Sequence, residues 1–252
     1  MPIPFVCIQI TPIRNTSFRL FMGLKFRTYP IGQDVLTLEF QGLTPLFLRQ
    51  IMSGLRTHFG QYLDILAVNG SLTLFEKDIS NNQTDIEEFL SGFRLSEIDK
   101  PHCWELAVHY NGADLEALSL QLGLSTQQII EQHQSQTYTI EGFGFLPGFF
   151  YASGLPKSLH VSRKNTPALR VPPRSVAIAG SQTGVYPVET SGGWHVLGEI
   201  AFDLFDHRSQ PPMFMNVGDE LRFKSVTKQE LNEWSQAWMQ VDDRKRLLSC
   251  SR

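Results

Sequence analysis

Residues 143–151 read FGFLPGFFY, and this stretch decides how the chain must be divided. Pro147 and its neighbouring glycines rule out a helix, because proline lacks a backbone donor and glycine weakens a helix interior. The whole segment 138–194 is dense in glycine, proline and aromatic residues. Short extended runs such as 175–180 and 194–204 are joined by Gly- and Pro-rich turns. This pattern predicts a barrel or sandwich in the second half of the chain.

The first half has the periodicity of a small α/β unit. Its extended and helical runs alternate in the order ββαββαβ, which predicts an antiparallel sheet with helices on one face. The Asn69-Gly70 dipeptide is suited to a tight hairpin. Strands are predicted at residues 23–29, 35–40, 63–68, 72–75 and 104–110, with helices at 45–59 and 86–93.

Capping residues mark the predicted helix starts. Thr84 with Glu87, and Ser125 with Gln128, match the capping box, in which two side chains bond free backbone N–H groups of the first turn. We expect Glu87 and Glu88 to be solvated at the positive end of their helix and not to form an acid–base pair. Residues 227–241 carry a further capped, amphipathic pattern, which predicts a C-terminal helix packed on its own barrel; partner docking is the alternative.

Composition excludes several classes of protein. The 252 residues are 42% hydrophobic and 19% charged, which predicts packed cores and fits two domains. Lys plus Arg total 22 against 25 Asp plus Glu, so no basic excess favours nucleic-acid binding. No apolar run reaches the ~20 residues of a membrane span. We therefore expect a cytoplasmic protein without a signal peptide, and we expect residues 1–21 to be an extension outside the fold.

Neither the cysteines nor a search for common catalytic motifs identifies a metal site or a catalytic site. Cys7, Cys103 and Cys250 are an odd number without a CxxC pair, so we expect reduced thiols and no zinc site. There is no Walker A motif and no G-x-S-x-G elbow. His195 and Glu199 would lie about 13 Å apart on one strand, too far to share a metal ion. No metal is predicted, and His195 stays a weak acid–base candidate.

The Gly/Pro segment contains a candidate binding site. Gly192 and Gly193 can expose successive backbone N–H groups to an anion, and nearby arginines can add charge. Neutral donors and acceptors suit an amide or lactam, and aromatic rings can wall a pocket. The alternative is that these residues only hold barrel turns and core. The candidate substrate-binding residues are Phe145, Pro147, Gly148, Arg163, Arg170, Gln182, Thr183, Tyr186, Gly192, Gly193 and Trp194.

Several of these blocks resemble one family. The blocks are 144–149, 170–172, 175–180, 182–187 and 192–194, together with Pro167 and Gly198. They are similar to the family of the 5-oxoprolinase B subunit, which includes allophanate hydrolase subunit 1, a histidine-kinase inhibitor of sporulation and a carboxyltransferase subdomain of urea amidolyase. The resemblance is dense over 138–224 and looser over 22–137. Departures include Arg174, which stands where relatives carry glycine.

The resemblance implies a fold and a function. It implies a ferredoxin-like α+β domain over residues 22–110 and a cyclophilin-like β-barrel over 111–226, followed by the C-terminal helix within 227–252. It also implies one component of ATP-dependent 5-oxoprolinase, which cleaves 5-oxoproline to L-glutamate and in which this chain would join the A and C subunits. ATP, with Mg²⁺, would be the co-substrate, and no tightly bound cofactor is expected. A regulator of a sensor histidine kinase and a component of allophanate or urea breakdown remain the alternatives.

Overall fold

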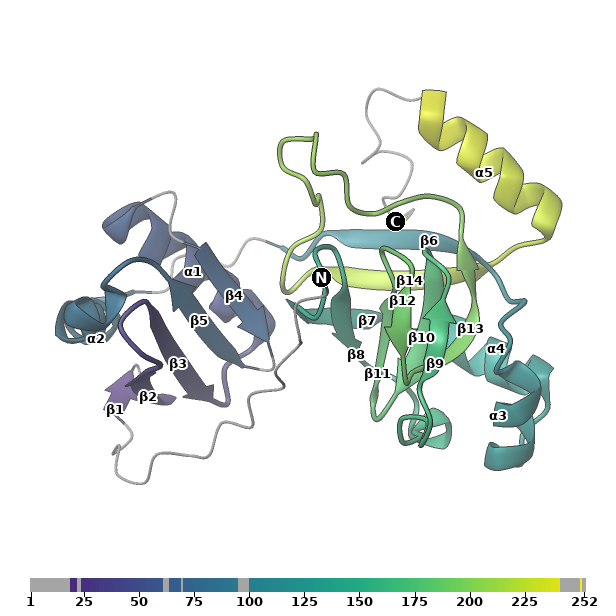
Figure 1. Ribbon diagram of the computed structural model, residues 1–252, viewed down its shortest axis with the longest axis horizontal. Helices are drawn as coiled ribbons and strands as arrows, with labels where there is room; N and C mark the ends of the chain where they lie inside the picture. The colour runs from purple at the N-terminus through teal and green to yellow at the C-terminus, as the bar shows by residue number, and fades with distance from the viewer. Residues whose placement is uncertain are drawn as a thin grey trace.

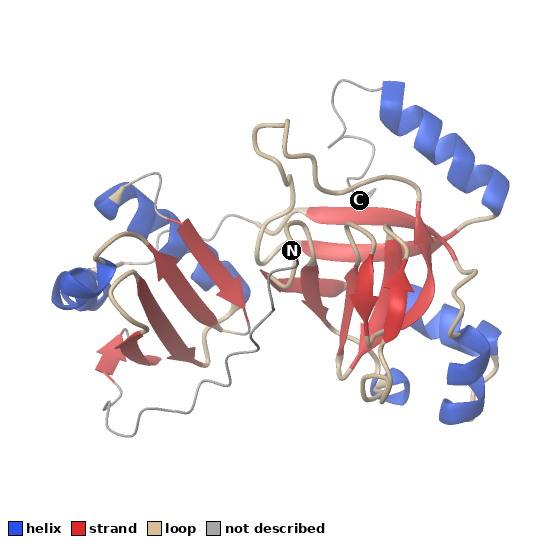
Figure 2. Cartoon of the chain, viewed as in Figure 1, coloured by secondary structure: helices blue, strands red, loops and turns tan. Residues whose placement is uncertain are grey.

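The computed structural model describes residues 19–21, 24–60, 64–68, 70–94, 100–240 and 250. Two structural units follow one another along the chain (Figure 1). The first is an antiparallel sheet with helices, and the second is a closed β-barrel with further helices outside it (Figure 2). None of the helices in these ranges has the length and apolar character needed to cross a bilayer.

The N-terminal unit is an antiparallel sheet whose helices follow its third and fifth strands. Its elements are β1 (Arg19–Phe21), β2 (Leu24–Pro30), β3 (Val35–Gln41), α1 (Pro45–Phe59), β4 (Asp64–Val68), β5 (Ser71–Phe75), η1 (Ile79–Asn82) and α2 (Gln83–Gly92). The strand order is β1-β2-β3-β5-β4. Because β5 pairs between β3 and β4, the segment from β3 to β5 is a split β-α-β unit. The predicted extension is wrong for residues 19–21, which pair with β2; residues 1–18 lie outside the described ranges.

Helix α1 forms where the sequence predicts it. Pro45 occupies its first turn, where a missing N–H costs nothing, and the helix ends before Gly60, whose φ is +138°. Leu48, Ile51 and Leu55 are fully buried and form the face that packs in the core of this unit.

The start of α2 differs from the prediction. Helix η1 runs directly into α2, so Thr84 lies inside the first turn and does not cap it. Glu87 is buried instead of solvated, and its carboxylate accepts hydrogen bonds from Thr28 and Gln83. The predicted Ser125–Gln128 capping box is confirmed in the second unit.

The second unit is a closed barrel with the strand order β10-β11-β8-β7-β14-β6-β13. Its strands are β6 (Cys103–His109), β7 (Tyr138–Phe143), β8 (Phe150–Ser153), β10 (Ser175–Ala179), β11 (Gln182–Val185), β13 (His195–Ile200) and β14 (Glu220–Ser225). Outside it lie the small sheet of β9 (Ala168–Val171) and β12 (Thr190–Gly192), and the helices α3 (Leu115–Leu122), α4 (Thr126–Gln134), η2 (Lys157–Leu159) and α5 (Lys228–Gln240).

Strand β6 corrects the predicted domain boundary. The sequence pattern assigns residues 104–110 to the first sheet, but β6 pairs in parallel with β14 and antiparallel with β13. The barrel therefore begins near residue 103, not 111. In the first sheet, β2 lies beside β3, and no described strand after α2 joins the sheet. The ferredoxin-like topology is therefore not confirmed, whereas the barrel is.

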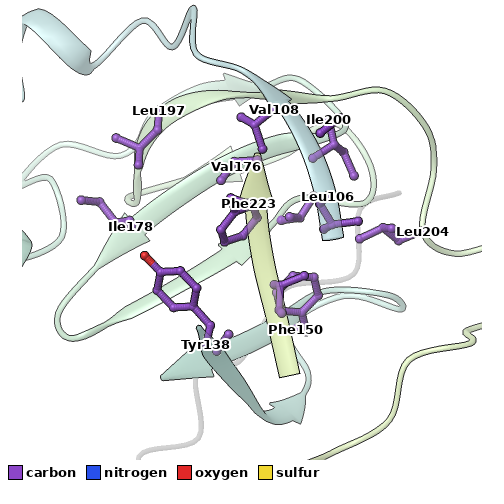
Figure 3. Packing of buried hydrophobic residues seen from close by; sticks show 14 of the residues in the cluster. Leu106, Val108, Tyr138, Phe150, Val176, Ile178, Leu197, Ile200, Leu204 and Phe223 are labelled. Carbon is purple, nitrogen blue, oxygen red and sulfur yellow. The ribbon is translucent and has the colours of Figure 1, made fainter. Parts of the chain in front are cut away.

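The barrel core follows the two-residue period of its strands. Figure 3 shows Tyr138, Phe150 and Phe223 converging in the interior with aliphatic side chains from the other strands. Val176 and Ile178 of β10 point into this core, while Ala177 between them packs in a separate outer cluster.

His133 of α4 is a fully buried polar member of the core. The Thr183 hydroxyl donates to the Ala177 carbonyl, so it must accept from the Nε2–H of His133 at 3.0 Å. The Nδ1 of His133 is then an acceptor for the Tyr110 hydroxyl at 2.7 Å. Burial lowers the pKa of His133 to about 3, which fits this neutral, fully bonded ring.

The C-terminal residues return to the barrel. Thr227 and Glu230 form the predicted cap of α5, and Trp238 stacks on Phe202 with ring centroids 3.9 Å apart. Packing of this helix on its own barrel is confirmed. The expectation of reduced thiols is wrong for Cys103 and Cys250, which form a disulfide because the chain end folds back beside the start of β6. Cys7 lies outside the described residues.

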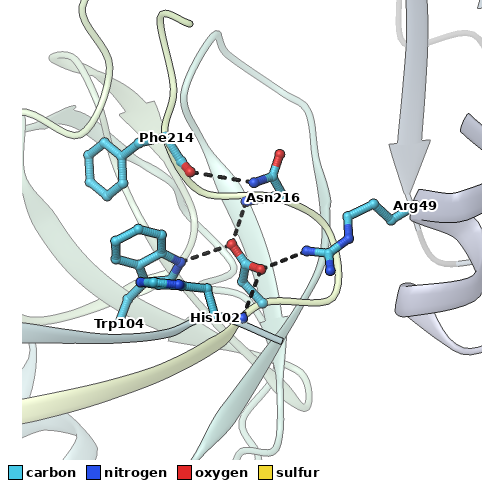
Figure 4. Close-up of polar contacts among 6 residues, drawn as sticks. Arg49, His102, Trp104, Phe214 and Asn216 are labelled. Atoms are coloured by element: carbon cyan, nitrogen blue, oxygen red, sulfur yellow. Dashed lines mark hydrogen bonds and ion pairs between the residues drawn. The ribbon is translucent and has the colours of Figure 1, made fainter. Parts of the chain in front are cut away.

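The two units are packed against each other through a glycine contact and an ion pair. A Cβ on Gly142 of β7 would lie 2.0 Å from the Ala67 carbonyl oxygen of β4, so only glycine permits this approach. Asp219, just before β14, is 1% exposed and accepts from Arg49 of α1 at 2.8 Å and from the Trp104 indole at 2.9 Å (Figure 4). Backbone N–H groups of His102 and Asn216 complete the shell of the carboxylate.

Candidate functional site

An aromatic cluster lies on the outer surface of the barrel, where several of the predicted site residues meet. Phe149 is its centre, with ring centroids 5.0 Å from Tyr151, 5.2 Å from Tyr186 and 5.5 Å from Trp194. The β9–β12 region contributes the buried Val171 to the same cluster. Alternation along the strands places these side chains outside the barrel, opposite the interior core.

Gly192 of β12 closes tightly on this cluster. A Cβ at this position would lie 2.3 Å from the Tyr186 hydroxyl, so a larger residue would displace the phenol. Burial raises the pKa of Tyr186, with smaller lowering effects from a hydrogen bond to the Trp194 backbone and from the charge of Arg163. Burial also raises the pKa of Tyr151, and Arg163 again opposes the rise. Arg163 thus brings positive charge close to two phenols.

Phe145 is the exposed aromatic member of the site. Its backbone has φ +68°, a conformation that non-glycine residues rarely adopt. Its ring is 52% exposed and makes edge contacts with Phe149 at 5.6 Å and with Tyr186 at 6.4 Å. Strained backbone that presents an aromatic ring to solvent is typical of binding sites. Pro147 follows in the same loop, at the third residue before β8.

Other predicted residues lie elsewhere or are engaged differently. Thr183 points into the barrel and bonds His133, so it is not a ligand donor on the outer surface. Arg170 is 77% exposed in its side chain and pairs with Glu189 at 2.8 Å. The Nε2 of His195 bonds the Ser162 carbonyl at 3.0 Å, a structural role. Gln182 is the first residue of β11, where it is the register partner of Ser153 in β8.

The Gly192-Gly193 pair lies beside the loop that carries Arg163. The carbonyl of Gly193 accepts the backbone N–H of Lys164 at 2.7 Å, which fixes the loop containing Arg163 beside the glycines. A Cβ on Gly193 would meet its nearest neighbour, Arg163, at 3.6 Å, so this glycine is not demanded by packing. Binding of a ligand by these residues stays a prediction.

A larger hollow lies between the two units, with a volume of about 1640 Å³. One wall is a second face of α1 that includes Arg49, Ser53 and Arg56. These residues are four and three positions apart, so they lie on the same side of the helix. The opposite wall is the loop 201–219, which carries Phe205 and two methionines. From the predicted segment, Gly148 reaches this cleft: a Cβ on it would lie 2.5 Å from Phe205.

Sequence reasoning missed this interdomain cleft. The apolar period of α1 predicts which face of the helix is buried, and it predicts that the polar face is exposed to solvent instead of lining a cleft. The charged residues at 94 and 100 flank the connection between the units, a position that carries no motif. The basic residues on α1 and around that connection were the available signal, but only the tertiary structure sets them opposite the loop 201–219.

The fold and these sites define a class of protein in which a small split β-α-β sheet is packed on a closed barrel. The family model described as the carboxyltransferase domain, subdomain C and D, matches residues 26–215. The chain belongs to this carboxyltransferase subdomain family, as the resemblance to the 5-oxoprolinase B subunit implied.

Curated relatives narrow the comparison. The chain is 43% identical over 122 residues to the 5-oxoprolinase B subunit of Escherichia coli O157:H7, covering 47% of this chain and 56% of that protein. It is 33% identical over 160 residues to the 5-oxoprolinase B subunit of Bacillus subtilis, covering 60% of this chain and 65% of the relative. The matches thus span less than two thirds of the length of these relatives.

Solved structures agree on the fold. The crystal structure of TTHA0988 is similar with a TM-score of 0.66 and 30% identity, covering 77% of this chain and 40% of the other. Urea carboxylase of Kluyveromyces lactis has a TM-score of 0.65 at 14% identity, covering 88% of this chain and 23% of the other. At that identity the second likeness concerns the fold alone.

Proposed function

We propose that this chain is the B subunit of an ATP-dependent 5-oxoprolinase, which converts 5-oxoproline to L-glutamate in a complex with its A and C subunits. The observation that carries the proposal is the identity to curated relatives of that name, within the family to which the chain belongs.

The chemistry explains why ATP is required. An unstrained lactam is a poor electrophile, so hydrolysis at neutral pH is slow. Transfer of the γ-phosphoryl group of MgATP to the lactam oxygen releases ADP and makes the carbon electrophilic. Water then adds to that carbon, and the carbon–nitrogen bond of the adduct breaks with a proton passing to the departing amine, which leaves an acyl phosphate. A second water hydrolyses this acyl phosphate to glutamate and inorganic phosphate. A protein that supports these steps must position the lactam and stabilise the developing negative charge.

The outer aromatic cluster offers groups of the required kind. The exposed Phe145 provides apolar surface for the ring, backed by the buried members of the cluster, and Arg163 provides positive charge for the carboxylate of 5-oxoproline. The Gly192 N–H is a candidate donor to the oxyanion. The remaining groups, including any general base, would come from the partner subunits.

Exposed apolar side chains beside this cluster suit an interface with another protein chain. Leu169 of β9 is 90% exposed, and Val188, two residues before β12, is 48% exposed. Isolated exposed apolar residues are common, but these two accompany the exposed Phe145 near the small β9–β12 sheet. We assign this surface to contact with the C subunit.

Reconstitution tests the proposal. The full chain, purified with the A and C subunits, should form glutamate and ADP in equal amounts from 5-oxoproline and MgATP, and omission of any one chain should stop the reaction. Arg163→Gln should raise the KM for 5-oxoproline, while Leu169→Lys should weaken retention of the C subunit. Failure of the complete set to form glutamate would refute the function, as would purification of the native protein with a histidine kinase in place of the A and C subunits.

A further inference from the structure

The cleft between the two units carries a charge pattern that the outer site does not use. Arg56, Arg94 and Lys100 line it, and none of its described lining residues is an aspartate or glutamate. Within the described ranges, Arg94 and Lys100 form no ion pair. Arg49, which also lines the cleft, forms an ion pair with Asp219. The described residues that line the cleft therefore include several cations and no carboxylate.

Aromatic rings lie on the same wall as these cations. The ring centroids of His58 and Phe89 are 4.9 Å apart, and those of Phe89 and Phe93 are 5.3 Å apart. Gly54 permits this packing, because a Cβ there would lie 2.3 Å from the Phe93 ring. Across the cleft, Met213 and other apolar side chains of the loop 201–219 face this wall. A flat apolar group could be held beside the positive charges.

A buried acceptor adds a polar feature to the cleft. The Oε1 of Gln50, which lines it, is inaccessible to solvent and has no hydrogen-bond partner among the described residues. A buried acceptor without a donor is costly, but this oxygen is covered by protein atoms, so no ligand contact is assigned to it.

The cleft has room for a ligand larger than an inorganic ion. At about 1640 Å³ the cleft exceeds the ~300–1000 Å³ of a pocket for one drug-sized molecule. An inorganic anion or a single small carboxylic acid would leave most of it filled with water. Several separate cations favour a ligand with more than one negative charge.

We propose that this interdomain cleft binds a nucleoside polyphosphate, with its phosphates at Arg56, Arg94 and Lys100 and its base beside the phenyl rings. The identification of that nucleotide as ATP rests on the proposed function. The cleft itself is inferred from charge, rings and volume. Because its walls come from both units, the bound nucleotide would contact α1 and the loop 201–219 together.

Calorimetric titration of the full chain at low salt tests the site. MgATP should bind, inorganic triphosphate should bind more weakly, and adenosine should bind more weakly still. The double variant Arg56→Gln/Arg94→Gln should lose at least about tenfold in affinity for MgATP, as expected when charge-assisted contacts are removed. Arg222→Gln is the matched control, because Arg222 is exposed on β14, bonds Thr137 and does not line the cleft.

Several outcomes would overturn part of this assignment or of the proposed function. No binding of MgATP at millimolar concentration, or equal affinity in the double variant and the wild type, would overturn the inference. Tighter binding of adenosine than of triphosphate would overturn the assignment of the cations. If MgATP binds as expected but the complete complex forms no glutamate, the proposed function fails and the cleft assignment stands. If the complex is active and the double variant leaves the KM for ATP unchanged, the cleft assignment fails alone.

Discussion

Arg174 lies in the turn before β10 with a φ of +66°, a left-handed conformation that costs a non-glycine residue about 1–2 kcal/mol. Its Nε is buried without a hydrogen bond, and its ion pair with Asp203 spans 3.9 Å on an exposed surface. Such a pair adds little stability. The departure from glycine at this position is therefore a local source of strain.

Replacing Arg174 by glycine should stabilise the protein. We expect Arg174→Gly to raise the free energy of unfolding by about 0.5–1 kcal/mol, because relief of the left-handed strain exceeds the entropy that glycine loses on folding. Urea denaturation of both proteins measures the change. Arg174→Lys keeps the Cβ and should show no gain; a Gly variant no more stable than the Lys variant would contradict the prediction.

His133 should make the stability depend on pH. In the unfolded chain its pKa is near 6.5, whereas burial lowers it to about 3 in the folded protein. Between these values only the unfolded state binds the proton, so the contribution is complete above pH 6.5 and is lost as pH falls. The expected loss is about 1.4 kcal/mol per pH unit.

Denaturation at pH 7.5, 6 and 5 measures this slope in the wild type and in His133→Gln. The other histidines are common to both proteins, so the difference between the two slopes isolates His133. The variant should be less stable than the wild type at pH 7.5. Between pH 6 and 5, its free energy of unfolding should fall by about 1.4 kcal/mol less per pH unit than that of the wild type. Parallel slopes would show that His133 is protonated in the folded barrel.

At the scale of elements, the contact of β4 with β7 depends on one residue without a side chain. The carbonyl of Ala67 approaches Gly142 so closely that any Cβ must separate the two strands. Gly142→Ala should cost about 1–3 kcal/mol through overpacking. Gly92→Ala is the matched control, because nothing lies within 4 Å of a Cβ there. It should be neutral or slightly stabilising; equal stability of the two variants would show that the strands are not held together at this point.

The helices and strands also show which structural features a short-range sequence pattern can predict and which it cannot. The apolar period of α1, the Ser125–Gln128 capping box and the Thr227–Glu230 cap were all predicted, because each depends on residues within one or two turns. The strand nature of β6 was predicted as well, but not its partners. Both sheets accept a short apolar strand, and the choice of β14 follows from barrel closure, which involves residues more than a hundred positions away.

At the scale of the molecule, the disulfide joins the start of the barrel to the end of the chain. Cys103 and Cys250 are 147 residues apart in sequence, so the bond closes a long loop in the unfolded state. Cys250→Ser should lower the free energy of unfolding by about 2–5 kcal/mol. Thiol titration of the unfolded, unreduced wild type should find one free thiol per chain, and reductant should bring the wild type to the stability of the variant. Three free thiols per chain without reductant would contradict the bond.

The sequence by itself determined the family, the division into an α/β unit and a barrel, the caps at Ser125 and Thr227, and the buried face of α1. These features depend on short-range periodicity and on the φ restrictions of glycine and proline, which act wherever the chain lies. The tertiary structure alone decided that Phe145, Tyr186 and Trp194 meet outside the barrel while Thr183 faces inward, that β6 belongs to the barrel, and that the polar face of α1 lines a cationic cleft. The physical reason is that such placements depend on which surfaces are packed together after the chain closes, and side chains far apart in sequence carry no local mark of their eventual neighbours.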